Sequence, residues 1–305
     1  MSTSTTPEES GARDCPVCSA DDSSALAAAG PDGLCPACGR KIPVSRDHAE
    51  LDLGLLAGVT DRGRRHQRNE DAMALATAAG PDGPVALVVV SDGVSSAPRP
   101  DEASLTAVRT GMQVLLSGAR AGEDPRTAAA AAARVSGEAL TELADREGSP
   151  AATYVSATVD RDVVTVCWLG DSRAYWLAED RADSVRLTQD DSLAEEIVAA
   201  GLASVDEAMA SPQAHVITRW LGADLPDPEP HVARFVPQGP GVVLVCSDGL
   251  WNYRPEPEGL AALALPTALT EPLAAAAGMV KFALDRGGLD NITVVLIPVP
   301  LSAAQ

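Results

Sequence analysis

Apolar runs that adjoin acidic residues recur at widely separated places in this chain of 305 residues. The four acidic clusters are Asn69-Glu70-Asp71, Asp92-Gly93, Asp248-Gly249 and Asp290-Asn291. The apolar runs predict strands, and strand ends that meet at one edge of a layered sheet would bring these acids together. This pattern constrains the fold strongly, because four distant segments must end at the same place.

Clustered carboxylates favour hard divalent cations, and His or thiol ligands are scarce in these segments. Two such ions about 3.5–4 Å apart bind phosphoryl oxygens and lower the pKa of a bridging water. The pattern therefore predicts hydrolysis at two Mg²⁺ or Mn²⁺ ions without a covalent intermediate. Each fragment taken alone is more typical of a turn, since Asp-Gly commonly follows a strand. Only the ordered set points to a metal centre.

Hydrophobic periodicity predicts an α+β layered domain. Strands are predicted at 85–91, 153–159, 163–169, 231–236, 242–247 and 292–298, and helices at 101–120, 126–146, 192–201 and 269–285. The third helix has a capping box, with Ser192 followed by Glu195, and Gly201 as its C-cap. Long central helices with strand hairpins around them favour layers over regular βαβ repeats.

The charge balance narrows the class of partner. The chain has 43 acidic and 23 basic residues and a formal net charge of −20, which argues against nucleic acid as the main partner. No apolar run reaches the ~18 residues of a membrane helix. The polar segment from Met1 to Gly11 lacks the basic and apolar parts of a secretory signal, so we expect a cytoplasmic protein.

Two Cys-x-x-Cys pairs stand near the N-terminus, and they are Cys15, Cys18, Cys35 and Cys38. This spacing predicts one structural zinc ion bound by four thiolates, with redox or disulfide cysteines as the alternative. Four thiolates leave no open position for a substrate, so the ribbon would dock a partner or only fold locally. The predicted divisions are a disordered tail at 1–13, the zinc ribbon at 14–41, a linker at 42–52, the main domain at 53–299 and a tail at 300–305.

Seven motifs in the main domain occur in a characteristic order. They are Thr60-Asp61-Arg62-Gly63 with Arg68-Asn69-Glu70-Asp71-Ala72, Ser91-Asp92-Gly93, Gly170-Asp171-Ser172-Arg173, Leu187-Thr188-Gln189-Asp190-Asp191-Ser192, Thr218-Arg219-Trp220-Leu221-Gly222, Ser247-Asp248-Gly249-Leu250-Trp251, and Asp290-Asn291-Ile292-Thr293-Val294. In this set the chain resembles the bacterial metal-dependent Ser/Thr protein phosphatases of type 2C. The resemblance spans about 57–298 and implies a β-sandwich of two antiparallel sheets flanked by helices.

The resemblance also implies roles for individual residues. Asp92 would bridge both metals, the Gly93 carbonyl would complete one site, and Asp248 and Asp290 would hold the second ion. Glu70 and Asp71 would bind metal-bound waters and orient the nucleophile. Asp171 reads as a buried structural carboxylate with Arg173 as its partner.

One departure from the family pattern concerns substrate phosphate. Relatives have an Arg five residues before the second acid of Asn-Glu-Asp, where this chain has His66. His66, or the neighbouring Arg65 or Arg68, would then supply the phosphate-binding donor. The alternative is that His66 is only an exposed loop residue.

Two other departures from the family pattern concern the residues that follow Asp92-Gly93 and the ligand of a third metal. Ser95 and Ser96 replace the usual glycines, and they are candidates to cap the next helix. Bacterial relatives hold a third, weaker metal; Glu147 or Asp145 would supply its private ligand here, with Asp191 nearby. His215 falls in the segment that matches the family's flap.

The leading interpretation is a protein serine/threonine phosphatase that opposes a bacterial Ser/Thr kinase. The alternative is a catalytically weak scaffold or phosphoprotein-binding module that docks through its zinc ribbon. The retained acids favour the enzyme, whereas His66, Ser95 and Ser96 keep the alternative open.

Overall fold

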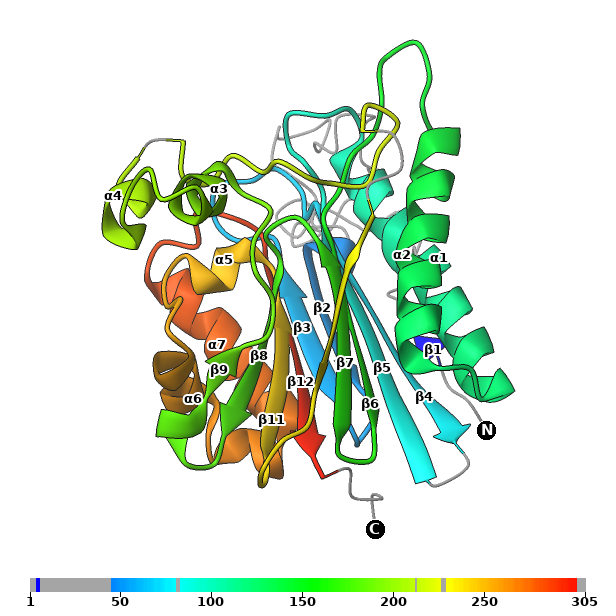
Figure 1. Ribbon diagram of the computed structural model, residues 1–305, viewed down its shortest axis with the longest axis vertical. Helices are drawn as coiled ribbons and strands as arrows, with labels where there is room; N and C mark the ends of the chain where they lie inside the picture. Colours follow the sequence, from blue (N-terminus) through cyan, green and yellow to red (C-terminus); the bar gives the residue numbers. More distant parts are fainter. Residues whose placement is uncertain (1–3, 6–44, 81–82, 212, 226–228, 301–305) are drawn as a thin grey trace, which may run out of the picture.

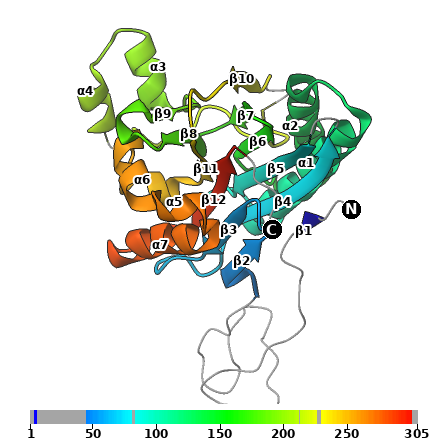
Figure 2. The same ribbon diagram turned by 90° about the horizontal axis from the view of Figure 1, so that it is seen from below.

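Two antiparallel sheets pack face to face at the centre of the protein (Figure 1). The computed structural model describes residues 4–5, 45–80, 83–211, 213–225 and 229–300. The first sheet has the order β1 (Ser4–Thr5), β4 (Asp71–Gly80), β5 (Gly83–Asp92), β6 (Tyr154–Asp160), β7 (Val163–Leu169) and β10 (His231–Phe235). The second has the order β2 (His48–Asp52), β3 (Ala57–Asp61), β12 (Ile292–Val299), β11 (Gly241–Cys246), β8 (Arg173–Ala178) and β9 (Val185–Arg186). Figure 2 shows β10 at the edge beyond β7.

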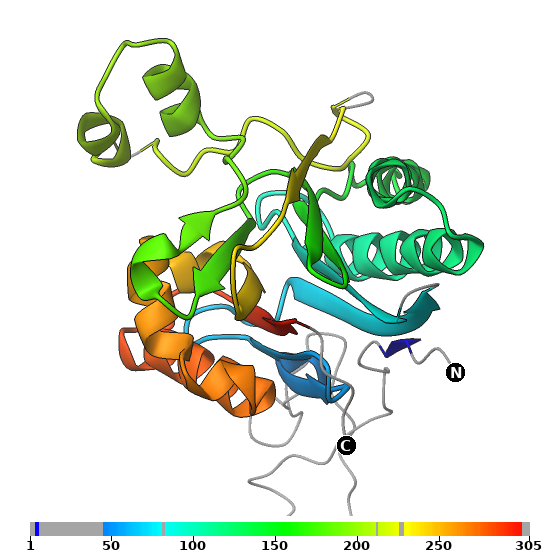
Figure 3. The same ribbon diagram turned by 60° about the horizontal axis from the view of Figure 1, so that its bottom comes forward.

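Helices cover the outer face of each sheet (Figure 3). The first sheet is covered by α1 (Pro100–Ala121) and α2 (Pro125–Glu142), and the second by α5 (Asp248–Trp251), α6 (Pro257–Ala264) and α7 (Pro272–Asp285). Two short helices, α3 (Leu193–Ala199) and α4 (Val205–Met209), project from one end of the sandwich (Figure 1). Short 3₁₀ turns are η1 (Ser45–Asp47), η2 (Arg181–Asp183) and η3 (Thr267–Leu269).

The central strands are apolar along their whole length because both of their faces are buried. In β5, Val85, Leu87 and Val89 pack under α1 and α2. The alternate residues Ala86, Val88 and Val90 face the second sheet. This period of two assigns one sequence run to two separate hydrophobic layers.

Local sequence signals set the helix ends. Gly122 has a left-handed φ of 67° and closes α1, since its N–H and that of Glu123 donate to the last carbonyls of the helix. Asp124 then caps α2 by accepting from the N–H groups of Arg126 and Thr127. Ser192 caps α3 as its capping box predicts.

The four predicted helices and six predicted strands are present with shifted ends. The strands absent from the prediction include β4, whose Ala-rich sequence lacks the β-branched signal. The structure also differs from the predicted linker at 42–52, because His48–Asp52 form the edge strand β2. Ser4 and Thr5, in the predicted tail, pair with β4.

The predicted zinc ligands Cys15, Cys18, Cys35 and Cys38 lie outside the described residues. Two further cysteines, Cys167 on β7 and Cys246 on β11, are buried and free. Within the described ranges, no helix combines the length and apolarity needed to cross a bilayer.

A buried ion pair lies beneath the end of the sandwich. Arg173 donates to both carboxylate oxygens of Asp190 at 2.9 and 2.6 Å, and its guanidinium lies 3.5 Å from the ring centre of Trp251. The carboxylate that pairs with Arg173 is therefore Asp190 and not Asp171, the partner that the sequence predicts. The indole of Trp251 donates instead to the backbone carbonyl of Asp171.

Candidate active site

The acidic clusters meet at one end of the sandwich, the upper end in Figure 1. Asp71 begins β4 and Asp92 ends β5, and the antiparallel register places these two residues directly opposite each other. Asp248 follows β11 and Asp290 precedes β12, which are adjacent antiparallel strands. Strand pairing brings the acids together two by two, and the packing of the two sheets places both pairs at the same end, as the sequence predicted.

Asp71, at the start of β4 in the first sheet, is held by side chains of the second sheet. Its Oδ2 accepts hydrogen bonds from Ser247 Oγ at 2.6 Å and Thr293 Oγ1 at 2.7 Å. Thr293 Oγ1 also lies 2.7 Å from Thr60 Oγ1, which accepts from Asn69. The other oxygen, Asp71 Oδ1, is buried and has no hydrogen-bond partner among the described residues. Asp71 is thus oriented with one acceptor left free.

Both Asp-Gly pairs need glycine because a backbone segment passes too close for a side chain. A Cβ on Gly93 would lie 2.2 Å from the Pro100 carbonyl oxygen, and one on Gly249 would lie 1.9 Å from that of Asn291. The Gly93 N–H donates to the carbonyl of Glu70 at 3.1 Å. These glycines pack the acidic strand ends tightly together.

Asp248 opens α5, and its Oδ2 accepts from Asn252 Nδ2 at 3.0 Å. Its Oδ1 is buried and lacks a hydrogen-bond partner in the part of the chain that the structure describes. Asp290 is more open, since 40% of its side chain is exposed, and its Oδ1 lies 3.1 Å from His66 Nε2. Two buried acceptor atoms, on Asp71 and Asp248, thus remain unsatisfied.

Burial and mutual repulsion disfavour the charged forms of these acids. Burial first, and then the negative charge of neighbouring aspartates, raises the pKa of Asp92 and Asp248 well above the ordinary value. Burial raises the pKa of Asp71 to about 6, and burial together with the Asp190 charge raises the pKa of Asp171 to about 7. Bound cations would favour the ionised carboxylates.

Except for Asp71, which is buried, these acids line a cleft of about 560 Å³. The lining includes Asp92, Gly93, Asp171, Asp248 and Asp290, and no Arg or Lys stands among the described residues that line it. No three acidic, His or Cys side chains form a ready-made metal cage in the described ranges. The oxygen donors and the two unsatisfied acceptors nevertheless suit hard cations that complete their shells with water.

The three candidate phosphate-binding residues, His66, Arg65 and Arg68, have different surroundings. His66 lies between two acids, with Nε2 near Asp290 and Nδ1 3.7 Å from Glu70 Oε2. Arg68 pairs with Asp101 at 3.3 Å, and Arg65 is exposed in a turn. None of the three lines the cleft, but His66 alone has a recorded contact with Asp290 and Glu70 among the described residues, so it is the candidate nearest to the site.

Among the described residues, neither Glu147 nor Asp145 forms a hydrogen bond or ion pair with Asp191, although the Glu147 N–H donates to Asp145 Oδ1 at 2.8 Å. Both carboxylate oxygens of Asp191 are engaged, one by the Gly170 N–H at 3.0 Å and one by His231 Nε2 at 2.9 Å. Glu147 is exposed in a turn beside Asp145, which pairs with Arg99 at 2.9 Å. The third site stays a prediction.

Two supporting residues, Ser95 and Asn291, have contacts that the sequence did not predict. Ser95 Oγ donates to Glu70 Oε2 at 2.5 Å, whereas the N-cap of α1 is Arg99 with no side-chain capping bond. Ser95 therefore orients Glu70 instead of capping α1. Asn291 accepts from the Glu70 N–H and donates to the carbonyls of Arg62 and Arg68. Only the tertiary structure identifies these contacts.

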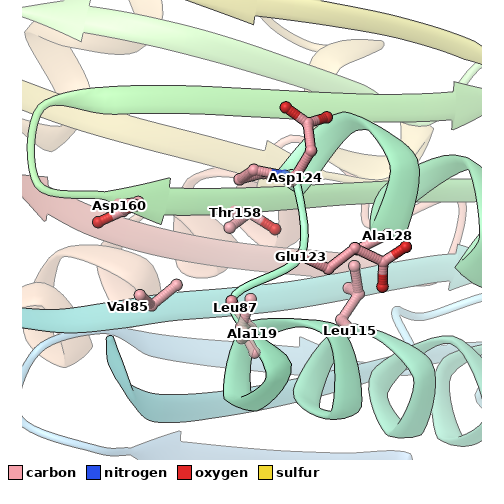
Figure 4. Close-up of a pocket in the computed structure, with 11 residues that line it drawn as sticks. Val85, Leu87, Leu115, Ala119, Glu123, Asp124, Ala128, Thr158 and Asp160 are labelled. Atoms are coloured by element: carbon pink, nitrogen blue, oxygen red, sulfur yellow. The ribbon is translucent and has the colours of Figure 1, made fainter. Parts of the chain in front are cut away.

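A smaller pocket of about 210 Å³ lies between the α1–α2 connection and the first sheet (Figure 4). Leu87, Leu115 and Ala119 contribute apolar surface, and the carboxylates of Glu123 and Asp124 stand at its edge. Val85 lies near the start of β5, whereas Asp92 lies at its end, so this pocket is separate from the acidic cleft.

We expect the metal-free protein to lose stability as pH rises. The pKa values of about 6 for Asp71 and about 7 for Asp171 exceed the ordinary 3.8, so the folded chain keeps protons that the unfolded chain releases. The unfolded state then binds fewer protons, and the free energy of unfolding falls between about pH 4 and pH 7. Calorimetry in EDTA should show Tm several degrees lower at pH 8 than at pH 5.

Two comparisons test this assignment. Asp171→Asn cannot ionise and should reduce the slope of Tm against pH, whereas Asp285→Asn on the exposed face of α7 should not. Manganese added at pH 8 should restore Tm, because cations favour the ionised carboxylates. A Tm that is independent of pH in EDTA would contradict the repulsion between these acids.

The fold and motifs have clear counterparts among known proteins. A family model described as Protein phosphatase 2C matches residues 60–279, most of the chain. The serine/threonine phosphatase stp of Listeria innocua is 35% identical over 146 residues, which cover 48% of this chain and 55% of the relative. The matched region thus spans about half the length of that curated relative.

Solved structures share the architecture over more of the chain. The Ser-Thr phosphatase MsPP of Mycobacterium smegmatis, in complex with cacodylate, is 29% identical with a TM-score of 0.61, covering 79% of this chain and 97% of that one. The catalytic domain of the phosphatase PstP, in complex with two manganese ions, is 25% identical with a TM-score of 0.64, covering 80% and 97%. With its matching family model and its sandwich of antiparallel sheets, this chain belongs to the protein phosphatase 2C family.

Proposed function

We propose that this protein is a metal-dependent protein serine/threonine phosphatase with two Mn²⁺ or Mg²⁺ ions. One observation carries the proposal: buried carboxylates with raised pKa values face an open cleft that no Arg or Lys lines among the described residues. Such a site needs bound cations for its acids to ionise. The manganese ions named for the PstP catalytic domain support the same choice of metal.

Asp92, the Gly93 carbonyl, Asp248 and Asp290 would hold the ions. When bound, two divalent ions orient the phosphoryl oxygens and lower the pKa of a water nucleophile. Asp71 would accept a hydrogen bond from that water through its free Oδ1, because Ser247 and Thr293 already fix its Oδ2. Glu70, oriented by Ser95, would play the same part from the other loop.

The substrates we propose are proteins phosphorylated by a bacterial Ser/Thr kinase. The named activities of the relatives support this class of substrate. The sequence also allowed a binding module without activity. That alternative does not explain why one buried oxygen each of Asp71 and Asp248 lacks a hydrogen-bond partner among the described residues.

We also propose that Cys15, Cys18, Cys35 and Cys38 bind one structural zinc ion. The support is their spacing, which suits a tetrahedral four-thiolate site.

Asp92→Asn should abolish phosphate release from a phosphothreonine peptide while the fold is kept. Activity of the parent protein should require Mn²⁺ and vanish in EDTA. The loss in Asp92→Asn and Asp248→Asn should exceed the roughly 10–100-fold caused by changes outside the ligand shell. Asp285→Asn is the matched control on an exposed helix face. Near-normal activity of Asp92→Asn would refute the two-metal assignment.

His66→Ala should raise KM for the phosphopeptide at saturating Mn²⁺ and leave kcat unchanged, as expected for a ground-state phosphate contact. The half-saturating Mn²⁺ concentration is measured in parallel, because His66 also contacts Asp290. A shift in that concentration alone would make His66 a positioning residue for the metal site. A larger rise in KM for Arg68→Ala would transfer the phosphate contact to Arg68.

Metal analysis of the purified full-length chain should find about one zinc that resists removal with the weakly held catalytic ions. Cys15→Ser should lose it, whereas Cys167→Ser, on a buried strand, should retain it. Equal zinc content in the parent protein and Cys15→Ser would exclude the four-thiolate site.

A further inference from the structure

The acidic cleft has a second half of different chemistry. Beside the carboxylates its lining includes an apolar wall made of Ala97, Pro98, Val216, Ile217 and Trp220. Two separate segments build this wall: the loop that follows Gly93 and the segment that precedes Leu221. The apolar wall is therefore part of the same cavity as the candidate metal ligands.

Backbone hydrogen bonds to the domain hold both segments of the apolar wall. The Val94 N–H donates to the Ala151 carbonyl at 2.9 Å, and the Leu221 N–H donates to the Ala152 carbonyl at 2.8 Å. The Val216 carbonyl accepts from the Leu193 N–H at the start of α3, at 2.9 Å. The apolar wall is thus built in advance of any ligand, which reduces the ordering cost of binding.

Val216 is unusual because 51% of this large apolar side chain is exposed. It stands at the cleft beside Ile217 and Trp220, so the exposed apolar surface is continuous and not a single scattered residue. The indole Nε1 of Trp220 makes no hydrogen bond within the described residues, so packing alone holds its ring. This surface offers a substrate apolar contact.

Charge around the apolar wall disfavours acidic ligands. The carboxylate of Asp224 lines this half of the cleft, and the basic side chain there is His215, since no Arg or Lys lines either half among the described residues. An acidic side chain of a substrate would be desolvated beside Asp224 and repelled by its carboxylate. An apolar side chain would instead bury surface against Val216 and Trp220.

We propose, on the basis of the proposed phosphatase function, that the apolar wall is a substrate subsite. It binds an apolar side chain within one or two residues of the phosphorylated Ser or Thr and disfavours Asp or Glu there. The cleft volume of about 560 Å³ lies within the roughly 300–1,000 Å³ typical of ligand sites and accommodates a short peptide segment. The protein therefore selects among phosphosites by their immediate neighbours.

Phosphothreonine peptides with Leu, Ala or Asp on either side of the phosphorylated residue test this subsite. With Mn²⁺, kcat/KM should fall in the order Leu, Ala, Asp, with Leu over Asp by roughly tenfold or more, the size of effect that small changes in hydrophobic pockets produce. Val216→Ser and Trp220→Ala should shrink the Leu-to-Asp ratio to about threefold or less. The ratio is taken within each variant, so a general loss of activity cancels.

The control is Val185→Ser on β9, where a valine of similar exposure, 40%, lies outside the cleft. Its ratio should match that of the parent protein. Val216→Ser changes a half-exposed side chain, so it keeps the test decisive even if Trp220→Ala fails to fold. A parent preference that persists in Val216→Ser and in folded Trp220→Ala would overturn the assignment to the apolar wall.

The small substrate para-nitrophenyl phosphate separates this proposal from the function on which it rests. Mn²⁺-dependent hydrolysis of it, with equal kcat/KM for the Leu, Ala and Asp peptides, would overturn the subsite and leave the phosphatase intact. No hydrolysis of this compound or of any peptide by folded protein would overturn both.

Discussion

Buried carboxylates that face one another at the end of the sandwich are the constraint on which the rest of the site depends. Burial and mutual repulsion raise the pKa values of Asp71, Asp92 and Asp248. Such an arrangement costs free energy in a chain without metal, because each ionised acid disfavours the next. Among the described residues no Arg or Lys lines the cleft to relieve it. Bound divalent cations would reduce this repulsion and would also activate a water molecule. The same buried carboxylates therefore destabilise the metal-free protein and provide its proposed metal ligands.

The surrounding residues keep the acids in place without neutralising them. Ser247 and Thr293 hold one oxygen of Asp71 with neutral hydroxyl groups, and Ser95 does the same for Glu70. Arg173 forms a buried ion pair with Asp190, so its positive charge is already neutralised. Positive charge is thus kept away from the positions where metals would bind. On the other side, the apolar wall adds contact surface without adding charge.

Residues that carry chemistry were predicted more completely than those that support it. Asp92, Asp248 and Asp290 were predicted because each adjoins an apolar run, and the packing of the two sheets brings them into one cleft. The contact of Ser95 with Glu70 and the pairing of Arg173 with Asp190 were not predicted, because such hydrogen bonds depend on side-chain directions that no periodicity encodes. Strand β4 was missed for a local reason, since alanine carries little strand signal and only the neighbouring strands impose the extended conformation.

The sequence by itself determined the layered α+β class, the acidic residues of the site and the order in which they appear. These properties follow from hydrophobic periodicity and residue type, which are local and therefore readable along the chain. Only the tertiary structure decided that His66 lies between Glu70 and Asp290, that Arg68 turns to Asp101, and that Val216 and Trp220 share the cleft with the acids. The physical reason is that these relations join segments from different loops, whose positions depend on how the two sheets pack and not on the residues next to them in sequence.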